Sequence, residues 1–288
     1  MPSGTMQWTA CAAPHVEDRY LNRGDARLRY RDQGAGPTVL FIHGWALDLD
    51  MWEPQAAVLA QRFRIVRFDR RGFGLSTGLP SLACDVEDAL ALCAHLKLER
   101  VACVGMSQGA RGALMLAAAA PKLIEYLALD GPPDPHALPS ASAEEEVPLT
   151  TYRRLLRTQG AAAVRREWAK HPMMQLRTTE ARTRELLQSM LDRYPCVDLL
   201  ESNAPLAARA TVAEFSLRLD AIRTPTLTIT GEFDLESRQR AANDLAQALP
   251  HAERIVIPGA GHLPNLDNPP AYSAALESFF KQHTSVNV

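Results

Sequence analysis

Residues 101–120 place the strongest constraint on what this chain can fold into. Residues 101–104 are an apolar run suited to a buried strand, and residues 110–120 have the pattern of a helix that ends before Pro121. The sequence Gly-Met-Ser-Gln-Gly joins the two, with Ser107 at its centre. Only small residues fit two positions on either side of so tight a strand-to-helix turn, so both glycines are steric requirements. The pattern predicts a strained turn that lifts the Ser107 hydroxyl clear of a sheet.

Strands and helices alternate on both sides of this turn. Apolar strand patterns occur at 38–42, 63–68, 101–104, 123–129, 226–230 and 254–257, and helical patterns at 85–96, 110–120 and 271–280. Residues 16–32 predict a hairpin that turns at 22–25, preceded by a loose arm at 1–15. The alternation predicts an α/β fold with a doubly wound, mostly parallel sheet.

The pattern changes between residues 134 and 218. Strand patterns are missing there, and Arg-rich amphipathic helical segments take their place at 151–158, 161–170 and 180–194. We therefore expect a helical cap at 134–218, inserted into a core made of residues 1–133 and 219–288. We expect this cap to roof an apolar pocket.

The composition limits the partners of this chain. With a net charge of −2 and no basic tract, nothing points to nucleic acid or another polyanion. No apolar run approaches the ~18 residues that a membrane span needs, and the N-terminus lacks a secretory signal pattern. The dispersed cysteines are typical of reduced thiols; they are Cys11, Cys84, Cys93, Cys103 and Cys196. We expect a cytoplasmic protein with a small-molecule partner and neither a nucleic-acid nor a membrane partner.

A serine hydroxyl is a weak nucleophile at neutral pH, so Ser107 needs a base and an acid that orients the base. Loops at the carboxyl ends of parallel strands open on one edge of the sheet. Asp234 follows the last predicted strand but one, and His262 follows the last. We therefore expect a catalytic triad of Ser107, Asp234 and His262, in that chain order. Asp130, at the end of the strand after the Ser107 turn, is an alternative acid.

An oxyanion formed at Ser107 needs two hydrogen-bond donors already aimed at it, each worth ~3 kcal/mol. The Gln108 amide, at the start of the helix, is the first candidate. The second lies in His43-Gly44-Trp45, after the first buried strand, and we assign it to the Trp45 amide, with a structural role for His43. We expect Trp45, Met106 and Asp130 to line the substrate pocket. This chemistry uses neither a metal nor a cofactor, and we expect none.

Taken together, these segments resemble the α/β-hydrolase superfamily, in the branch that carries a helical cap. The resemblance covers about residues 20–133 and 220–280. Its motifs stand in family order and spacing, and they are His43-Gly44-Trp45, Asp69 to Ser76, Gly105 to Gly109, Gly231 to Asp234 and Gly259 to His262. Ala110 departs from the pattern, because many relatives have a second glycine there, but alanine is still small.

Residues 257–269 are similar to the corresponding stretch of 3-oxoadipate enol-lactonases and related carboxylesterases. The resemblance implies a metal-free serine hydrolase that cleaves a small carboxylic ester or lactone through an acyl-enzyme on Ser107. Haloalkane dehalogenases and epoxide hydrolases are excluded, because they carry Asp at the position of Ser107. Carbon–carbon bond hydrolases, acyltransferases and perhydrolases use the same triad and stay open as alternatives. A ligand receptor that has kept the hydrolase fold is a more remote one.

Overall fold

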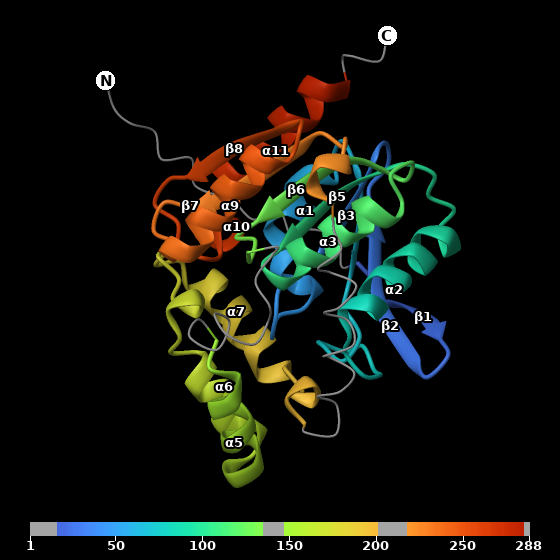
Figure 1. Cartoon of the computed structure of the whole chain (residues 1–288). Helices are drawn as coiled ribbons and strands as arrows, with labels where there is room; N and C mark the ends of the chain where they lie inside the picture. The colour runs from blue at the N-terminus through green and yellow to red at the C-terminus, as the bar shows by residue number, and fades with distance from the viewer. Residues whose placement is uncertain (1–15, 135–146, 201–217, 285–288) are drawn as a thin grey trace.

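An eight-stranded sheet forms the centre of the computed structural model, which describes residues 16–134, 147–200 and 218–284 (Figure 1). The strand order is β1-β2-β4-β3-β5-β6-β7-β8. β2 runs antiparallel to both of its neighbours, and every other neighbouring pair is parallel. The predicted α/β fold with a mostly parallel sheet is confirmed.

The elements follow the predicted alternation. The strands are β1 (Arg19–Arg23), β2 (Ala26–Gln33), β3 (Thr38–Ile42), β4 (Arg64–Phe68), β5 (Val101–Met106), β6 (Ile124–Asp130), β7 (Thr226–Gly231) and β8 (Ala252–Ile257). The helices of the core are α1 (Glu53–Leu59), α2 (Leu82–His95), α3 (Gln108–Ala119), α9 (Glu236–Ala248), α10 (Pro264–Asp267) and α11 (Pro269–Thr284). Short 3-10 turns are η1 (Leu49–Trp52) and η5 (Leu219–Ala221). We had not predicted α1, α9 or α10.

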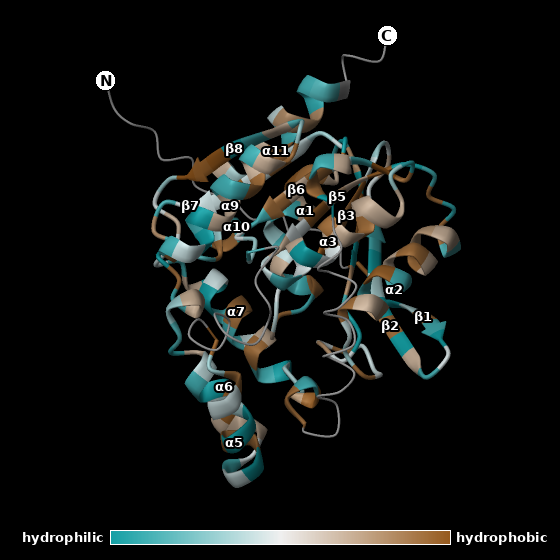
Figure 2. Cartoon of the chain, in the orientation of Figure 1, coloured by the Kyte–Doolittle hydropathy of each residue, from teal (hydrophilic) through white to brown (hydrophobic). Residues whose placement is uncertain are grey.

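Helices cover both faces of the sheet, and each face has its own hydrophobic core. Helices α2, α3 and α9 pack on the face that carries Leu40, Cys103 and Leu127. Helices α1 and α11 pack on the other face, which carries Val104 and Ala128. Hydrophobic residues are concentrated along the central strands (Figure 2). Because both faces are buried, the central strands are continuous apolar runs, which is the pattern that predicted them.

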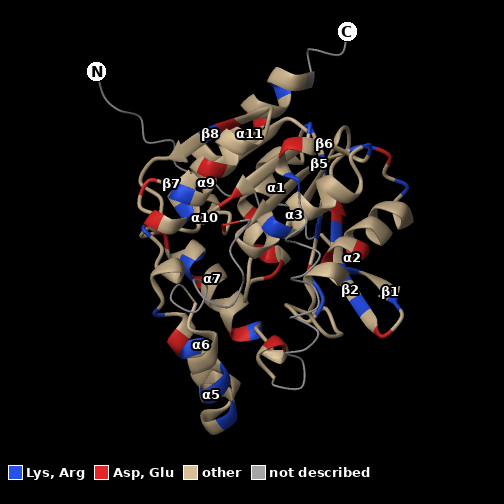
Figure 3. Ribbon diagram, in the orientation of Figure 1, with Lys and Arg blue, Asp and Glu red and all other residues tan. Residues whose placement is uncertain are grey.

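A helical insertion of described residues 147–200 separates β6 from β7. It contains α5 (Leu149–Gln159), α6 (Ala161–Trp168), η2 (Pro172–Met174), α7 (Ala181–Arg193) and η3 (Val197–Leu199), which lie together on one side of the sheet (Figure 1). Basic residues lie along α5 (Figure 3). The Arg193 guanidinium on α7 binds Asp48 and Asp50 next to η1, with nitrogen–oxygen distances of 2.7 and 2.6 Å. The insertion is thereby tied to the core by charge pairs that are partly shielded from water.

Some of the predicted segments lie outside the residues that the structure describes. These segments are the arm at 1–15, which contains Cys11, and residues 135–146 and 201–217 at the two ends of the expected cap. The four described cysteines form no disulfide, as expected. Among the described residues, no helix is both long and apolar enough to cross a bilayer.

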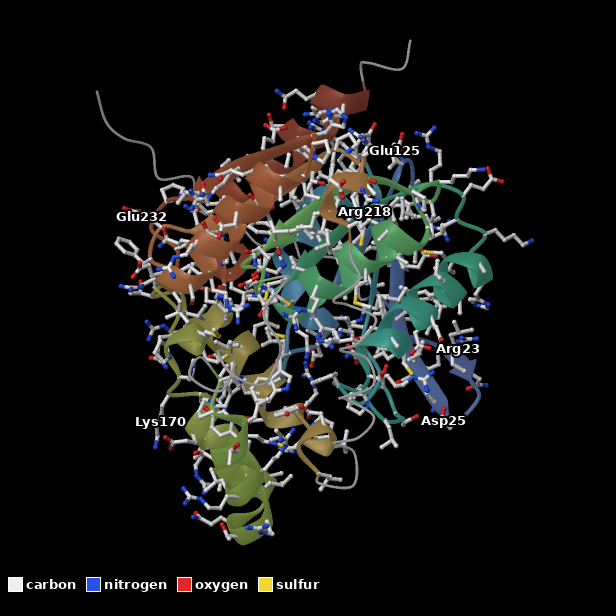
Figure 4. All side chains as sticks on the ribbon, in the orientation of Figure 1. Arg23, Asp25, Glu125, Lys170, Arg218 and Glu232 are labelled. Carbon is white, nitrogen blue, oxygen red and sulfur yellow. The ribbon has the colours of Figure 1, made fainter. Side chains whose placement is uncertain are left out.

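The predicted hairpin is β1 and β2, which turn at Gly24, where φ is +59°. Arg23 and Asp25 lie at this turn, and Glu232 lies near the opposite edge of the sheet, beyond β7 (Figure 4). The central strands β3, β5 and β6 lie between these edges, and the Ser107 turn follows β5.

The first turn of α3 lies in direct contact with the end of β3. A Cβ atom placed on Gly109 would lie 2.4 Å from the Ile42 carbonyl oxygen and 2.5 Å from the His43 carbonyl oxygen. Real Cβ atoms do not approach backbone oxygens so closely, so the position accepts only glycine without movement of the helix. A Cβ atom placed on Gly112, one turn further along α3, would have no neighbouring atom within 4 Å.

We expect Gly109→Ala and Gly112→Ala to have opposite effects on stability. Gly109→Ala forces α3 away from β3 and should lower the free energy of unfolding by about 2 kcal/mol or more. Gly112→Ala meets no neighbour and should raise it by about 0.5–1 kcal/mol, because alanine favours the helix. Urea unfolding of both variants measures the difference. Equal effects would contradict the close contact of α3 with β3.

Candidate active site

Ser107 occupies a strained turn between β5 and α3. Its φ and ψ angles are +52° and −117°, a conformation that a residue with a side chain adopts at a cost of about 1–3 kcal/mol. The Ser107 amide donates a 2.7 Å hydrogen bond to the Asp130 carbonyl on β6, which holds the turn in place. A Cβ atom on Gly105 would lie 2.3 Å from the Gly109 carbonyl oxygen. The predicted need for glycine on both sides of the turn is therefore confirmed.

His262 and Asp234 form a buried pair. The distance between His262 Nδ1 and Asp234 Oδ1 is 2.8 Å, and both side chains are almost entirely shielded from solvent. The same Asp234 oxygen accepts the Leu235 amide at 2.8 Å, which fixes the carboxylate at the start of α9. A carboxylate at Nδ1 selects the imidazole tautomer whose Nε2 is free to accept a proton.

The two loops that carry this pair are closely packed together. A Cβ atom on Gly231 would lie 2.1 Å from the Gly261 carbonyl oxygen, so the loop after β7 needs glycine to cross the loop after β8. The Phe233 amide donates to the Ala260 carbonyl at 2.8 Å. Gly131, after β6, closes the third side, because its Cβ would lie 2.9 Å from His262 Cε1. The loops after three neighbouring strands therefore fix the position of one imidazole ring.

The loop after β3 contains the buried, neutral His43. The geometry assigns a proton to Nδ1, which donates to the Gly44 carbonyl at 2.7 Å, while Nε2 accepts the Arg70 amide at 2.8 Å. Burial, together with the charge of Arg70, holds the pKa of His43 well below its usual value. A Cβ atom on Gly44 would lie 2.7 Å from Met106 Sδ, so glycine allows this loop to approach the Ser107 turn. His43 thus supports the loop that presents Trp45.

Gln108 begins α3 and is held by a buried arginine. Arg70 donates to Gln108 Oε1 at 2.7 Å and to Asp85 Oδ2 at 2.9 Å. Burial raises the pKa of Asp85, and the Arg70 charge opposes that rise. Arg70 also donates to His43, from its amide to Nε2 at 2.8 Å and from its guanidinium to the carbonyl at 3.5 Å, so this residue connects the two segments that we expect to supply the oxyanion donors.

A cavity of about 250 Å³ opens on these residues. Ser107 and His262 lie in its wall together with Trp45 and Met106, the two apolar residues that we had expected there. The other lining residues are Leu47 from the core and Val147, Trp168, Met173 and Met174 from the insertion. Apart from Ser107 and His262, every described lining residue is apolar or aromatic.

Asp130 lies at the end of β6 but is not among the described residues that line this cavity. Its side chain is fully buried, with the Tyr272 hydroxyl beside its carboxyl group. Burial raises the pKa of Asp130 well above its usual value; the charge of Asp234 raises it further, and the nearby Tyr272 hydroxyl opposes the rise. Asp234, and not Asp130, makes the hydrogen-bond contact with the histidine.

Four insertion residues in the cavity wall were not predicted. No local motif marks Val147, Trp168, Met173 or Met174, because apolar residues at helical spacing are equally typical of ordinary helix packing. Within the described residues, no group of three or more His, Cys, Asp and Glu side chains is arranged to hold a metal ion.

Comparison with known proteins agrees with this fold. A family model described as the alpha/beta hydrolase fold matches residues 37–269. The chain is 26% identical to a pimeloyl-(acyl-carrier protein) methyl ester esterase of Pectobacterium atrosepticum, over 88% of this chain and 98% of that enzyme. It is 27% identical to a 2-(acetamidomethylene)succinate hydrolase of Mesorhizobium japonicum, over 93% and 96%. The crystal structure of an enol-lactonase from Burkholderia xenovorans matches with a TM-score of 0.73 and 25% identity, over 91% of this chain and all of that one.

We expect Asp130→Asn to stabilise the protein at neutral pH. Because the pKa of Asp130 is raised on folding, the folded protein keeps a proton that the unfolded chain releases above about pH 4. Stability is therefore lost as the pH rises above that value, at about 1.4 kcal/mol per pH unit until the raised pKa is reached. Asparagine has no proton to release, so the variant should exceed the wild type in unfolding free energy at pH 7 and approach it at pH 4. Urea unfolding at both values measures this. A variant less stable than the wild type at pH 7 would show that Asp130 is ionised and paired.

Proposed function

The chain belongs to the α/β-hydrolase family, and we propose that it is a serine hydrolase that cleaves a small carboxylic ester or lactone. One observation carries this proposal. His262, whose Nδ1 lies 2.8 Å from the buried Asp234 Oδ1, lines the same cavity as Ser107 in its strained turn. A nucleophile, a base and an acid that orients the base are the parts that acyl transfer to serine requires.

The first half of the reaction forms an acyl-enzyme. Ser107 Oγ attacks the substrate carbonyl carbon while His262 Nε2 takes the hydroxyl proton, and Asp234 stabilises the imidazolium that results. The oxyanion of the tetrahedral intermediate accepts hydrogen bonds from the Trp45 and Gln108 amides. When the intermediate collapses, the carbonyl is restored, the carbon–oxygen bond to the alcohol breaks, and His262 returns the proton to the leaving oxygen.

The second half repeats these steps with water. His262 Nε2 takes a proton from a water molecule, whose oxygen attacks the ester carbonyl on Ser107. The same two amides hold the second oxyanion, and collapse returns the proton to Ser107 Oγ and releases a carboxylic acid. In a lactone the alcohol and the acid belong to one molecule, so the product is a single hydroxy acid.

The cavity favours an apolar, uncharged substrate portion next to Ser107, because its described wall is apolar or aromatic apart from Ser107 and His262. The described lining has no Lys or Arg to pair with a carboxylate, and an unpaired charge there would lose its hydration. Ester and lactone chemistry is also supported by the similarity to two enzymes, the methyl ester esterase and the enol-lactonase.

A fluorophosphonate probe tests the nucleophile directly. We expect the folded wild-type protein to be labelled at Ser107, because an activated serine attacks phosphorus as it attacks a carbonyl carbon. Ser107→Ala should remain unlabelled, and peptide mapping by mass spectrometry locates the adduct. Ser76 is a suitable control site, because its hydroxyl is buried and donates to the Asp69 carbonyl at 2.7 Å. No adduct is expected on Ser76. Folded wild-type protein that stays unlabelled would rule out the proposed chemistry.

Kinetics of Asp234→Asn and Asp130→Asn separate the two candidate acids. Asp234→Asn loses the carboxylate at His262 Nδ1, so kcat for p-nitrophenyl acetate should fall by about 10³–10⁴-fold. Asp130→Asn leaves the contact between Asp234 and His262 in place and should retain most of the activity. The reverse order of losses would instead make Asp130 the acid of the triad. Circular dichroism of both variants checks that each is folded.

A further inference from the structure

An aspartate from the insertion binds the indole of Trp45. Asp198 lies in η3, and its Oδ2 atom accepts a hydrogen bond from Trp45 Nε1 at 2.6 Å. Its other oxygen, Oδ1, accepts the Tyr194 hydroxyl, also at 2.6 Å. Trp45 and Asp198 are 153 positions apart in the chain, so this bond joins the loop after β3 to the far end of the insertion.

The surroundings make these two bonds important for the conformation of the site. Part of Asp198 is exposed, but its carboxyl group is surrounded by protein. Burial raises the pKa of Asp198, and the Tyr194 hydroxyl, the Trp45 indole and the charge of Arg70 oppose the rise. A carboxylate in such a place is costly unless its donors are fixed, and bonds to charged acceptors are among the stronger ones in proteins.

Aromatic rings from α5, from α6 and from the residue that follows α7 surround the same indole. The Trp45 ring meets Trp168 edge-on at 4.7 Å and Tyr194 edge-on at 5.4 Å between centroids. It stacks on Tyr152 at 6.1 Å. Tyr194 in turn stacks on Phe73 of the core at 5.9 Å, with the two planes 7° apart. The indole therefore has a single direction, set by the carboxylate at one edge and by rings around it.

Asp198 does not line the cavity, whereas Trp45 does. The Trp45 residue also holds the amide that we assign to the oxyanion hole, and the next residue, Ala46, has a φ of +59°. Few backbone conformations with a positive φ are open to alanine, so the main chain at Trp45 and Ala46 has little freedom to adjust if the Trp45 side chain changes direction.

We propose that Asp198, together with Tyr194, is a positioning pair that fixes the Trp45 indole, so that the insertion sets both the oxyanion hole and the adjoining cavity wall. The proposal rests on the serine hydrolase function proposed above. Neither residue touches the reacting atoms; both act through Trp45. The completed oxyanion hole therefore depends on a contact between insertion and core.

Asp198→Ala is the central test, with Asp192→Ala as its matched control. Asp192 is an exposed aspartate on α7 whose partner is Gln188 on the same helix. With p-nitrophenyl acetate as substrate, Asp198→Ala should lower kcat by about 10–100-fold, as expected for a small displacement of a catalytic donor. KM should change by no more than about threefold, because little binding surface is lost. Asp192→Ala should keep the wild-type constants.

A double-mutant cycle distinguishes positioning from general stability. Trp45→Phe removes the indole N–H, so it should lower kcat by itself, and adding Asp198→Ala should cause little further loss. Additive losses, or a wild-type kcat in Asp198→Ala with only a lower melting temperature, would overturn the proposal. If Asp198→Ala does not fold, Tyr194→Phe and Trp45→Phe decide, since wild-type kcat in both would also overturn it.

A readout independent of turnover separates this proposal from the proposed function. The tryptophan emission of Asp198→Ala should differ from that of the wild type, and the difference should vanish in the Trp45→Phe background. Unlabelled wild-type protein in the fluorophosphonate experiment would refute the hydrolase function, whereas an unchanged emission spectrum would refute the indole contact. Slower fluorophosphonate labelling of Asp198→Ala than of Asp192→Ala would support the positioning role.

Discussion

The close approach of α3 to the ends of β3 and β5 is the constraint on which the rest of the site depends. Ser107 takes its left-handed conformation because backbone atoms fill the space on both sides of the turn, and Gly105 and Gly109 leave room for them. The hydrogen bond from the Ser107 amide to the Asp130 carbonyl anchors the turn to β6. A strained residue stays strained only when its surroundings leave it no alternative. Here those surroundings are main chain, which cannot rotate away as a side chain can.

Buried charged residues next to the Ser107 turn fix the positions of the surrounding segments. Arg70 connects Gln108, Asp85 and the His43 loop, and Arg71 pairs with the buried Asp88 at 2.8 Å. Pairs of this kind add little net stability, because removing both charges from water costs about as much as their attraction returns. Their directional bonds nevertheless allow few alternative arrangements. The arginines of the core therefore define geometry more than they contribute stability.

The sequence predicted the core better than the insertion, for a physical reason. Strands such as β5 and β6 are buried on both faces, so their apolar runs are visible without any knowledge of their neighbours. The glycines of the Ser107 turn, Gly105 and Gly109, are visible for a similar reason, because the turn motif is contained in five consecutive residues. Helix α9 was missed because it buries small residues, with only Ala241, Ala242 and Leu245 as its apolar contacts with the core.

The partners of the insertion residues are set by tertiary contacts and leave no local pattern. Asp198 resembles any charged residue in an Arg-rich helical stretch until the fold brings Trp45 to it. In the same way, Met173 and Met174 follow an ordinary proline turn, and only the folded chain shows that they face Ser107. Asp130 illustrates the reverse case. Its position at the end of a strand made it a candidate acid. Which carboxylate lies within hydrogen-bond distance of His262 Nδ1, however, depends on how the loops after β6, β7 and β8 pack together, and the sequence does not show this.

The cavity wall is built from two parts of the chain, the core and the insertion. The main-chain crowding around Ser107 and His262 involves core segments, whereas Trp168, Met173 and Met174 belong to the insertion. Exchange of Met173 and Met174 would change the shape of the cavity without adding an atom to the crowded main-chain crossings. Methionine suits that position, since its flexible thioether adapts to differently shaped neighbours. Substitutions at these two methionines would therefore change the cavity wall while leaving Ser107, His262 and the contacts of Trp45 in place.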